Sequence, residues 1–304
     1  MSGRIVITGA GGQLGRYLTS LTARQGRDAV ALTSSQWDIT DPAAAERIVQ
    51  RGDVVINCAA YTDVDGAESD EARAFAVNEA GPGHIARACA QAGAQLVHVS
   101  TDYVFNGDFG GAAPRPYEPT DHTAPQSVYA RSKLAGERAV LAALPDPAQG
   151  KVVRTAWVYT GGTGKDFVAV MRRLAAGDGP VNVVDDQTGS PTYVGDLAAA
   201  LLQIIDDRVP GPILHAANEG ACSRFEQARA VFEECGADPQ RVRPVSTAEF
   251  PRPAPRPAYT ALGSGQSVAA GMRPLRPWRP ALVAALAASD GYATAERPLP
   301  STRD

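Results

Sequence analysis

The chain has 304 residues, with 29 lysines and arginines, 33 aspartates and glutamates and a formal net charge of −4. This length suits one large domain with a smaller attached lobe, and the lack of a basic run argues against nucleic acid as a partner. The four cysteines contain no CxxC pair, which argues against a disulfide framework or a zinc site. With no signal peptide and no apolar run of roughly 20 residues, we expect a cytoplasmic protein without a membrane partner.

Short β-branched runs alternate with helical patterns along the first third of the chain. Asp41 followed by Pro42 predicts a helix start, and Gly26 and Gly93 lie where helices should end. Because the strands are continuously apolar, we predict an α/β fold with a doubly wound parallel sheet buried on both faces. The expected elements are a strand at 4–9, a helix at 13–25, strands at 29–34 and 53–60 separated by a helix at 42–50, two helices up to 92, and a strand at 95–105.

The remainder of the chain suggests a second, smaller unit. A loop rich in Gly and Pro over 106–125 precedes a helix that carries Tyr129, and long loops at strand ends often hold functional residues. Further strands and helices follow up to about residue 217, and the pattern then changes to one helix and a segment rich in Pro and Arg. We predict a main domain over 1–160 and 180–217, a C-terminal lobe over 161–179 and 218–290, and a loose tail over 291–304.

The first strand runs directly into a glycine-rich turn, "GAGGQLG", that starts a helix. Gly9 would permit the sharp turn, Gly12 the approach of a pyrophosphate to backbone N–H groups, and Gly15 close packing of helix on strand. Gln13 and Leu14 lie within the same predicted nucleotide site. The spacing is GxxGxxG rather than GxGxxG, and a glycine turn without a ligand is the alternative interpretation.

The end of the second strand bears on which dinucleotide would bind. Thr33, Ser34 and Ser35 stand where an NAD-specific site usually has a carboxylate, which favours NADPH, with NADH tolerated. No arginine follows the strand to bind a 2′-phosphate. Asp38 and Ile39 could approach the adenine, and Asp38 could equally be a solvated turn residue.

Tyr129 and Lys133 lie four residues apart and therefore on one face of the predicted helix. A nearby ammonium favours the phenolate and lowers the pKa of a phenol from about 10. The pair therefore fits a tuned acid, whose lysine could also bond a nicotinamide ribose. Taken alone, the YxxxK pattern also fits a half-buried tyrosine with a solvated lysine.

Hydroxyls also occur at the end of the strand over 95–105. Ligands of open α/β sheets bind outside the carboxyl ends of the strands, so Ser100, Thr101 and Asp102 are placed to meet a substrate. A hydroxyl there could hydrogen-bond a carbonyl group. Alternatively, Ser100 and Thr101 only satisfy backbone groups at the strand end.

Glycine turn, strand-end hydroxyl and YxxxK in this order resemble the extended short-chain dehydrogenase/reductases, and more closely the dTDP-4-dehydrorhamnose reductase family. The resemblance covers about residues 4–287 and implies an NAD(P)-binding Rossmann domain with a lobe that binds a sugar nucleotide. The segments that carry it are "VITGAGGQLG", "DITD", "DVVINCAAYTDVDGAE", "VNEAGPGHIA", "STDYVFNG", "YARSKLAGE", "VVRTAWVY", "DDQTGSPTYVGDLA" and "RPAYTALGS".

This resemblance implies a reaction and a set of roles. NAD(P)H would deliver hydride to C4 of a dTDP-4-dehydro sugar, Tyr129 would donate a proton to the C4 oxygen, Lys133 would hold the ribose and tune the phenol, and Thr101 would complete the triad. The other implied cofactor residues are Ala59, Ala60, Tyr61 and Asn78. The other implied substrate residues are Thr62, Val64, Tyr103, Phe105 and Trp157.

The resemblance also bears on metals and oligomers. Some members form dimers through a magnesium ion held by glutamates of the first helix and of the "SPT" region. The corresponding segments here, "GRYLTS" and "SPTYVGDLA", contain no glutamate. We therefore expect no bound metal, and either a monomer or a homodimer that no metal bridges.

Two alternatives use the same fold. A nucleotide-sugar 4,6-dehydratase or epimerase is the nearer one, but dehydratases have a glutamate after Thr-Asp, where this chain has Tyr103. A regulatory subunit that binds NADP without turnover is the other. The presence of Thr101, Tyr129 and Lys133 together argues against it, because a protein that only binds has no need of the acid.

Overall fold

A central parallel sheet organises the structure, a computed structural model that describes residues 3–162 and 164–295. Its six strands lie in the order β10-β5-β4-β3-β1-β2, and every pairing is parallel. The predicted α/β fold with a doubly wound parallel sheet is thereby confirmed. The strands are β1 (Ile5–Thr8), β2 (Ala29–Leu32), β3 (Val54–Asn57), β4 (Gln95–Thr101), β5 (Gly150–Thr155) and β10 (Ile213–His215).

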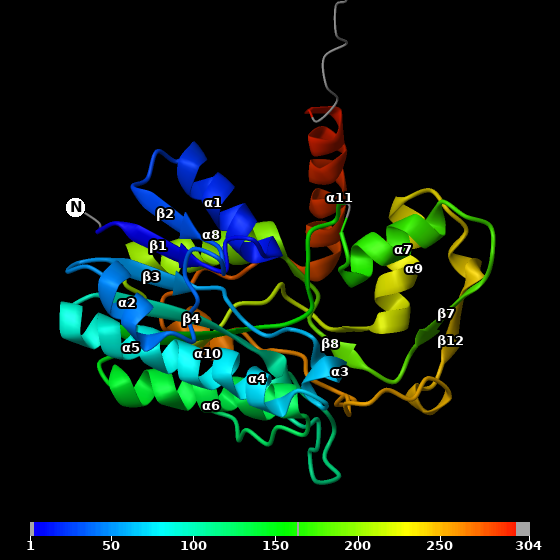
Figure 1. The fold of residues 1–304 in the computed structure, drawn as a ribbon. Coiled ribbons are helices and arrows are strands. Elements are labelled where there is room, and N and C mark those ends of the chain that lie inside the picture. Colours follow the sequence, from blue (N-terminus) through cyan, green and yellow to red (C-terminus); the bar gives the residue numbers. More distant parts are fainter. Residues whose placement is uncertain (1–2, 163, 296–304) are drawn as a thin grey trace, which may run out of the picture.

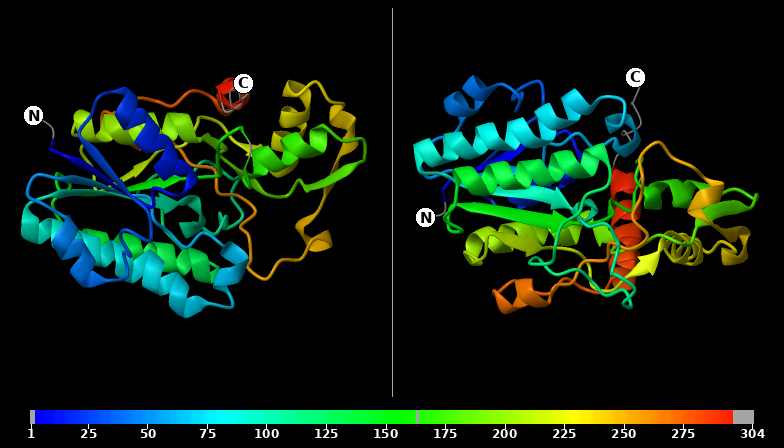
Figure 2. Two further views of the ribbon diagram at one scale, coloured as in Figure 1. Left: turned by 45° about the horizontal axis from the view of Figure 1, so that its top comes forward. Right: turned by 90° about the horizontal axis from the view of Figure 1, so that it is seen from below.

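Helices cover both faces of this sheet, as the views in Figures 1 and 2 show. Two hydrophobic clusters fill the layers between sheet and helices, because all residues of strands such as β1 and β3 are buried. One face is covered by α1 (Gln13–Arg24) and α8 (Val194–Asp206), and the other by α2 (Pro42–Ile48), α5 (Gly81–Ala92) and α6 (Val128–Ala143). We call the sheet and these helices the main domain.

Local capping signals agree with the observed helix ends. The Asp41 side chain accepts the Ala43 N–H at 2.9 Å, with Pro42 at the first position of α2. Gly26 and Gly93 follow α1 and α5 with φ values of 62° and 68°, a conformation that glycine adopts without steric cost. These three predictions are confirmed.

Strand β4 ends at Thr101, earlier than the predicted end at Phe105. The Tyr103 N–H donates to the Thr101 hydroxyl at 3.2 Å and begins a 3-10 helix, η2 (Asp102–Val104). The turn redirects the chain, so that Phe105 is fully buried and stacks on Tyr117 with ring centroids 4.1 Å apart.

The lobe is a separate layer beside the carboxyl ends of the main strands (Figure 1). Its core contains Val168, Phe232 and Leu282. The boundary differs from the predicted one, because the strand that begins at Val181 pairs in parallel with a lobe strand and not with the main sheet. The lobe elements are α7 (Phe167–Ala175), β7 (Val181–Val184), β8 (Thr188–Gly189), β11 (Cys222–Ser223), α9 (Arg224–Glu234), η3 (Pro239–Arg241), β12 (Val242–Val245) and η4 (Thr247–Glu249).

The C-terminal part of the chain crosses back before it ends. Helix α10 (Gly265–Ala269) returns to the main domain, where the Ser267 hydroxyl accepts the His215 N–H at 2.8 Å. Helix α11 (Trp278–Ala295) then packs on the lobe core. The first five residues of the predicted tail over 291–304 are therefore helical, and 296–304 lie outside the described residues. The remaining elements are α3 (Val64–Ala67), α4 (Glu71–Phe75), η1 (Ala76–Ala80), β6 (Val158–Tyr159) and β9 (Thr192–Tyr193).

Across the described residues, no helix combines the length and the apolar character needed to cross a membrane.

Candidate active site

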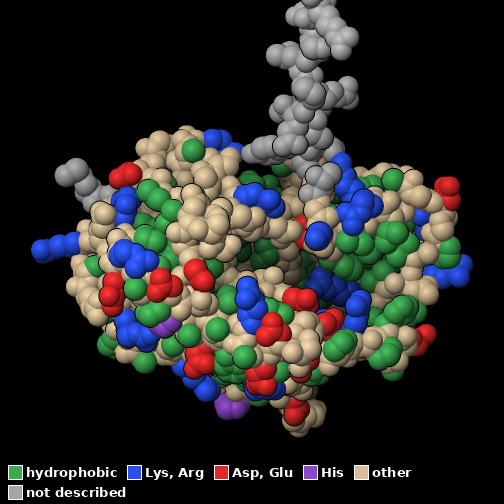
Figure 3. All heavy atoms as spheres, viewed as in Figure 1, with side chains coloured by type: hydrophobic (Ala, Val, Ile, Leu, Met, Phe, Trp, Pro, Cys, Tyr) green, Lys and Arg blue, Asp and Glu red, His purple; other side chains and the backbone are tan. Residues whose placement is uncertain are grey.

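A cleft of about 1290 Å³ opens at the carboxyl ends of β1, β3, β4 and β5. The space-filling view shows the molecule hollowed between the main domain and the lobe, with basic side chains near the opening (Figure 3). Most of the predicted site residues line this one cleft. They are Gly9, Gly12, Gln13, Leu14, Gly15, Asp38, Ile39, Ala59, Ala60, Tyr61, Thr62, Thr101, Tyr129, Lys133 and Trp157.

The glycine turn forms one end of the cleft. Gly9 has a φ of 62°, and a Cβ at this position would lie 2.7 Å from the Ala59 backbone nitrogen. A Cβ on Gly15 would lie 2.3 Å from the Gly9 carbonyl oxygen, so this glycine allows helix α1 to pack closely on the turn. Gly12 begins α1 without a side-chain cap, which leaves first-turn N–H groups for a ligand. The turn therefore fits a pyrophosphate group.

The neighbouring wall fits the adenosine half of a dinucleotide with a 2′-phosphate. The hydroxyl side chains at the end of β2 line the cleft together with Arg16 and Arg73, which come from α1 and α4. The sequence offered no arginine directly after β2, and only the fold brings these two guanidinium groups to the same cleft. Asp38 also lines the cleft, but its carboxylate accepts the backbone and side-chain hydrogens of Thr40 at 2.9 and 2.7 Å. These bonds, followed by the charge of Arg73, lower the pKa of Asp38.

Asn78 acts behind the wall of the cleft and is not part of it. Its side chain accepts the Tyr61 N–H at 2.9 Å, donates to the Tyr61 carbonyl oxygen at 3.1 Å and donates to the Ser132 hydroxyl at 3.0 Å. These bonds hold the loop 59–62 in place. Val64 lies at the start of α3 and does not line the cleft either. We expected Asn78 to contact the cofactor and Val64 to contact the substrate, and the cleft includes neither residue.

Tyr129 and Lys133 both reach the cleft from α6. The Lys133 ammonium donates to the Val99 carbonyl oxygen at 2.7 Å, and burial lowers its pKa to about 8. Burial raises the pKa of Tyr129, and a hydrogen bond with Thr101 opposes the rise. The expected lowering of the Tyr129 pKa by Lys133 is therefore not observed, because the ammonium faces the backbone of β4.

The two strand-end hydroxyls have different partners. Ser100 donates to the Glu137 carboxylate at 2.6 Å, and Glu137 forms an ion pair with Arg154 at 2.7 Å. Ser100 therefore lines the cleft but bonds a buried side-chain carboxylate, and not the backbone groups of the alternative interpretation. Thr101 instead bonds to Tyr129 and to Asp102, so it is the hydroxyl that belongs to the candidate catalytic group.

Aromatic and basic side chains lie where the cleft meets the lobe, and apart from Tyr129 only Trp157 of those named here lines the cleft itself. Trp157 has a φ of 47°, unusual for a residue other than glycine, and the Arg224 guanidinium lies 3.5 Å from the centre of its ring. Tyr103 packs edge-on against Tyr129 with ring centroids 6.1 Å apart. Its hydroxyl group hydrogen-bonds to both Arg224 and Arg256. Tyr103 therefore joins the candidate catalytic residues to the lobe.

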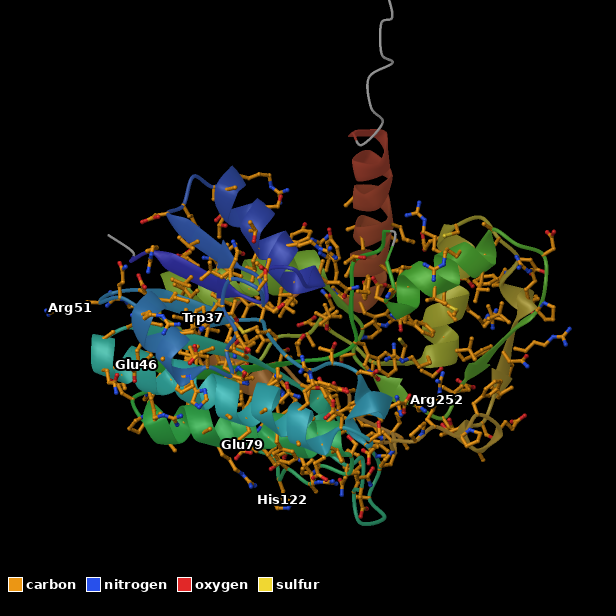
Figure 4. All side chains as sticks on the ribbon, viewed as in Figure 1. Trp37, Glu46, Arg51, Glu79, His122 and Arg252 are labelled. Atoms are coloured by element: carbon orange, nitrogen blue, oxygen red, sulfur yellow. The ribbon has the colours of Figure 1, made fainter. Side chains whose placement is uncertain are left out.

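Sequence reasoning did not identify Arg224 and Arg256 as site residues. Arg256 forms an ion pair with Asp65, with Nη2 3.0 Å from Oδ2, and Arg252, labelled beside the lobe in Figure 4, lies 3.9 Å from the same carboxylate. The "RPAYTALGS" segment that contains Arg256 was the available signal, but its spacing carries no indication of a partner 191 residues away. Phe105, by contrast, was expected at the substrate and lies in the core.

Among residues 3–162 and 164–295, no group of three or more His, Cys, Asp or Glu side chains is placed to hold a metal ion.

Comparison with known proteins assigns the chain to a group of relatives. A family model described as RmlD substrate binding domain matches residues 3–290. A dTDP-4-dehydrorhamnose reductase of Mycobacterium tuberculosis is 75% identical over 100% of this chain and 99% of its own length. The protein of the same name from Mycolicibacterium smegmatis is 61% identical, over 99% of this chain and 90% of its own length.

Solved structures agree with these matches. A dTDP-4-dehydrorhamnose reductase from Clostridium acetobutylicum superposes with a TM-score of 0.87 at 36% identity, covering 94% of this chain and 99% of its own. The enzyme of the same name from Bacillus anthracis, solved in complex with NADP, superposes with a TM-score of 0.85 at 37% identity, covering 93% of this chain and 98% of its own.

Proposed function

Because the chain belongs to the RmlD substrate binding domain family, we propose that it reduces the C4 ketone of dTDP-4-dehydro-L-rhamnose to give dTDP-L-rhamnose. The near full-length identity to relatives named for this reaction supports the assignment. The observation that carries it is the meeting of Thr101, Tyr129 and Lys133 with the glycine turn in one cleft. Three segments that lie apart in the sequence thereby supply one site for a cofactor and a ketone.

NADPH is the proposed cofactor, with NADH accepted less readily. The Bacillus anthracis relative was solved in complex with NADP. For the present chain, the residues that line the cleft support the same cofactor. The uncapped start of α1 suits the pyrophosphate, while Arg16 and Arg73 beside the β2 hydroxyls suit a 2′-phosphate. When bound, the reduced nicotinamide supplies the hydride for C4.

Tyr129 supplies the proton in the proposed reaction. Burial keeps its phenol protonated at neutral pH, so it can donate to the C4 oxygen as the ketone becomes an alcohol. Lys133, with a pKa of about 8, is mostly an ammonium at pH 7 and provides positive charge beside the cofactor ribose. Thr101 holds the phenol through its hydrogen bond.

The lobe end of the cleft is proposed to bind the sugar nucleotide. Arg224 and Arg256 suit the diphosphate, because planar guanidinium groups form paired, charge-assisted hydrogen bonds with phosphate oxygens. Trp157 and Tyr103 would flank the sugar. Tyr103 occupies the position at which a dehydratase has a glutamate, so simple reduction is favoured over elimination. The glutamate-free "GRYLTS" and "SPTYVGDLA" segments support a monomer, or a homodimer without a metal bridge.

The test combines purified protein, NADPH and dTDP-4-dehydro-L-rhamnose, with loss of NADPH absorbance as the readout. The wild-type protein should oxidise NADPH only when the sugar is present. Tyr129→Phe should lower kcat by about 10²- to 10⁴-fold, because only the donated proton is removed, while the Kd for NADPH stays within about twofold.

The matched control is Tyr117→Phe. Tyr117 does not line the cleft, and its hydroxyl accepts the Gly107 N–H at 3.0 Å. Loss of this hydroxyl should leave kcat near the wild-type value. A Tyr129→Phe enzyme with wild-type kcat would contradict the proposed role of the phenol.

A further inference from the structure

We propose that Asp102 is a positioning residue for the reduction: it sets the direction of the Thr101 hydroxyl and is itself held in place by Thr260. The proposal rests on the proposed function, since it assigns Asp102 and Thr260 a part in the same reaction. Thr260 belongs to the C-terminal segment. Under this proposal, that segment helps to position the proton donor, Tyr129, of the main domain.

The Asp102 carboxylate lies directly behind the candidate catalytic threonine. Its side chain is 2% exposed, and each carboxylate oxygen accepts one hydroxyl hydrogen. Oδ1 accepts from Thr101 at 3.1 Å, and Oδ2 accepts from Thr260 at 2.5 Å. Thr260 is held in turn by its N–H, which donates to the Thr188 carbonyl oxygen at 2.8 Å. The carboxylate therefore has a fixed place between the strand end and the C-terminal segment.

Counting hydrogens gives the direction of each bond at Thr101. A threonine hydroxyl has one hydrogen and two lone pairs. Its hydrogen goes to Asp102, and one lone pair accepts the Tyr103 N–H at 3.2 Å. While this hydrogen is donated to Asp102, the Thr101 hydroxyl has none to give to the Tyr129 oxygen. An ionised Asp102 thus keeps Thr101 an acceptor, so that Tyr129 remains the hydrogen donor for the C4 oxygen.

Protonation of Asp102 would reverse the direction of its hydrogen bond with Thr101. A neutral carboxyl could donate to Thr101, whose own hydrogen would then turn toward the Tyr129 oxygen and displace the phenol from its donor orientation. Burial raises the pKa of Asp102 to about 6, opposed by the hydrogen bonds from Thr260 and Thr101. The charged and titratable groups that face the carboxylate are Arg224 from α9, Tyr103 on η2 and Tyr129 from α6.

The experiment measures kcat and KM against pH for the wild-type protein, Asp102→Asn, Thr260→Val and Thr260→Ser. In the wild-type protein, kcat should fall as the pH drops through about 6. Thr260→Val removes a bond that lowers the Asp102 pKa, so kcat should fall about tenfold at neutral pH and its acid limb should move to higher pH, with the KM for the sugar within about twofold. Thr260→Ser should restore the wild-type values.

Asp102→Asn should lose at least as much activity as Thr260→Val, and its kcat should show no acid limb near pH 6. The control is Thr22→Val, which removes a buried hydroxyl that donates to the Leu18 carbonyl oxygen at 2.9 Å in α1 and should leave the pH profile unchanged. The Kd for NADPH and the thermal midpoint of each variant separate misplacement of the phenol from loss of the fold.

Two results are to be distinguished. A wild-type protein that does not oxidise NADPH with the keto sugar would overturn the proposed function. An active wild-type protein, together with a folded Thr260→Val variant of unchanged kcat and pH profile, would overturn the role of Asp102 alone. If Asp102→Asn does not fold, Thr260→Val still decides the question.

Discussion

The two ends of the cleft are built in different ways. At the cofactor end, the turn from Gly9 to Gly15 is one continuous stretch, and it works through backbone shape and N–H groups. At the lobe end, Tyr103 meets Arg224 and Arg256, which lie far from it in the chain and act through their side chains. A short stretch of sequence can specify a turn that binds through its backbone. A site formed by side chains from distant segments depends on how the whole chain folds.

At the cofactor end, adding a single methyl group at Gly9 should have the largest effect on stability and on NADPH binding. Gly9→Ala places a Cβ 2.7 Å from the Ala59 backbone at a φ of 62°. Strain in the left-handed region and overpacking should together lower the free energy of unfolding by about 2–5 kcal/mol and weaken NADPH binding. Chemical denaturation and a fluorescence titration with NADPH measure both effects.

Gly26→Ala is the matched control, since Gly26 also has a φ of 62° but no atom within 4 Å of an added Cβ. It should lower the free energy of unfolding by about 1–2 kcal/mol and leave NADPH binding unchanged. Equal losses for the two variants would show that close approach at Gly9 contributes nothing, and the contrast between the two ends would weaken.

The lobe end should respond through substrate affinity. Arg224→Met removes the guanidinium over Trp157 and should raise the KM for the dTDP sugar roughly 10- to 100-fold, the effect expected for charged hydrogen bonds worth about 1.5–3 kcal/mol. The Kd for NADPH should change little. Steady-state kinetics and direct NADPH titration separate the two ligands.

Arg243→Met removes an exposed charge from β12 of the same lobe and serves as the control. If Arg224→Met weakened NADPH binding as much as sugar binding, Arg224 would belong to the cofactor end of the cleft, and the proposed division of the cleft would be wrong.

The smallest expected effect concerns the 2′-phosphate. Replacing both Arg16 and Arg73 by alanine should reduce the affinity for 2′,5′-ADP roughly tenfold, because each exposed charge contributes up to about 1 kcal/mol. Binding of 5′-AMP should be unaffected, and calorimetric titration compares the two ligands. Equal losses for both nucleotides would remove these arginines from the choice between NADPH and NADH.

Prediction from sequence succeeded where neighbours in the chain decide the structure. The parallel sheet, the Asp41–Pro42 helix start and the helical spacing of Tyr129 and Lys133 all follow from local patterns. It failed at Phe105, because a hydrogen bond from the Tyr103 N–H to Thr101 ends β4 early and turns Phe105 into the core. Asp102, a residue type depleted in strands, is the local sign of the break, but Tyr103, Val104 and Phe105 after it are residue types typical of a strand.

The expected tuning of Tyr129 by Lys133 illustrates a second limit. Helical spacing places both side chains on one face, yet it leaves open which acceptor each side chain meets. The Lys133 ammonium bonds the Val99 carbonyl oxygen in β4, and Tyr129 instead bonds Thr101. The boundary at residue 180 failed for a similar reason, because strand pairing with β12 depends on a segment about 60 residues away.

The sequence by itself determined the class of fold, the glycine turn and the common helical face of Tyr129 and Lys133, since each follows from periodicity or from the conformational freedom of glycine. Only the tertiary structure decided which side chains complete the site. The contacts of Arg224 and Arg256 with Tyr103, and of Thr260 with Asp102, join segments more than 100 residues apart. Such contacts arise when the lobe packs beside the strand ends, and no local rule of propensity or spacing contains that packing.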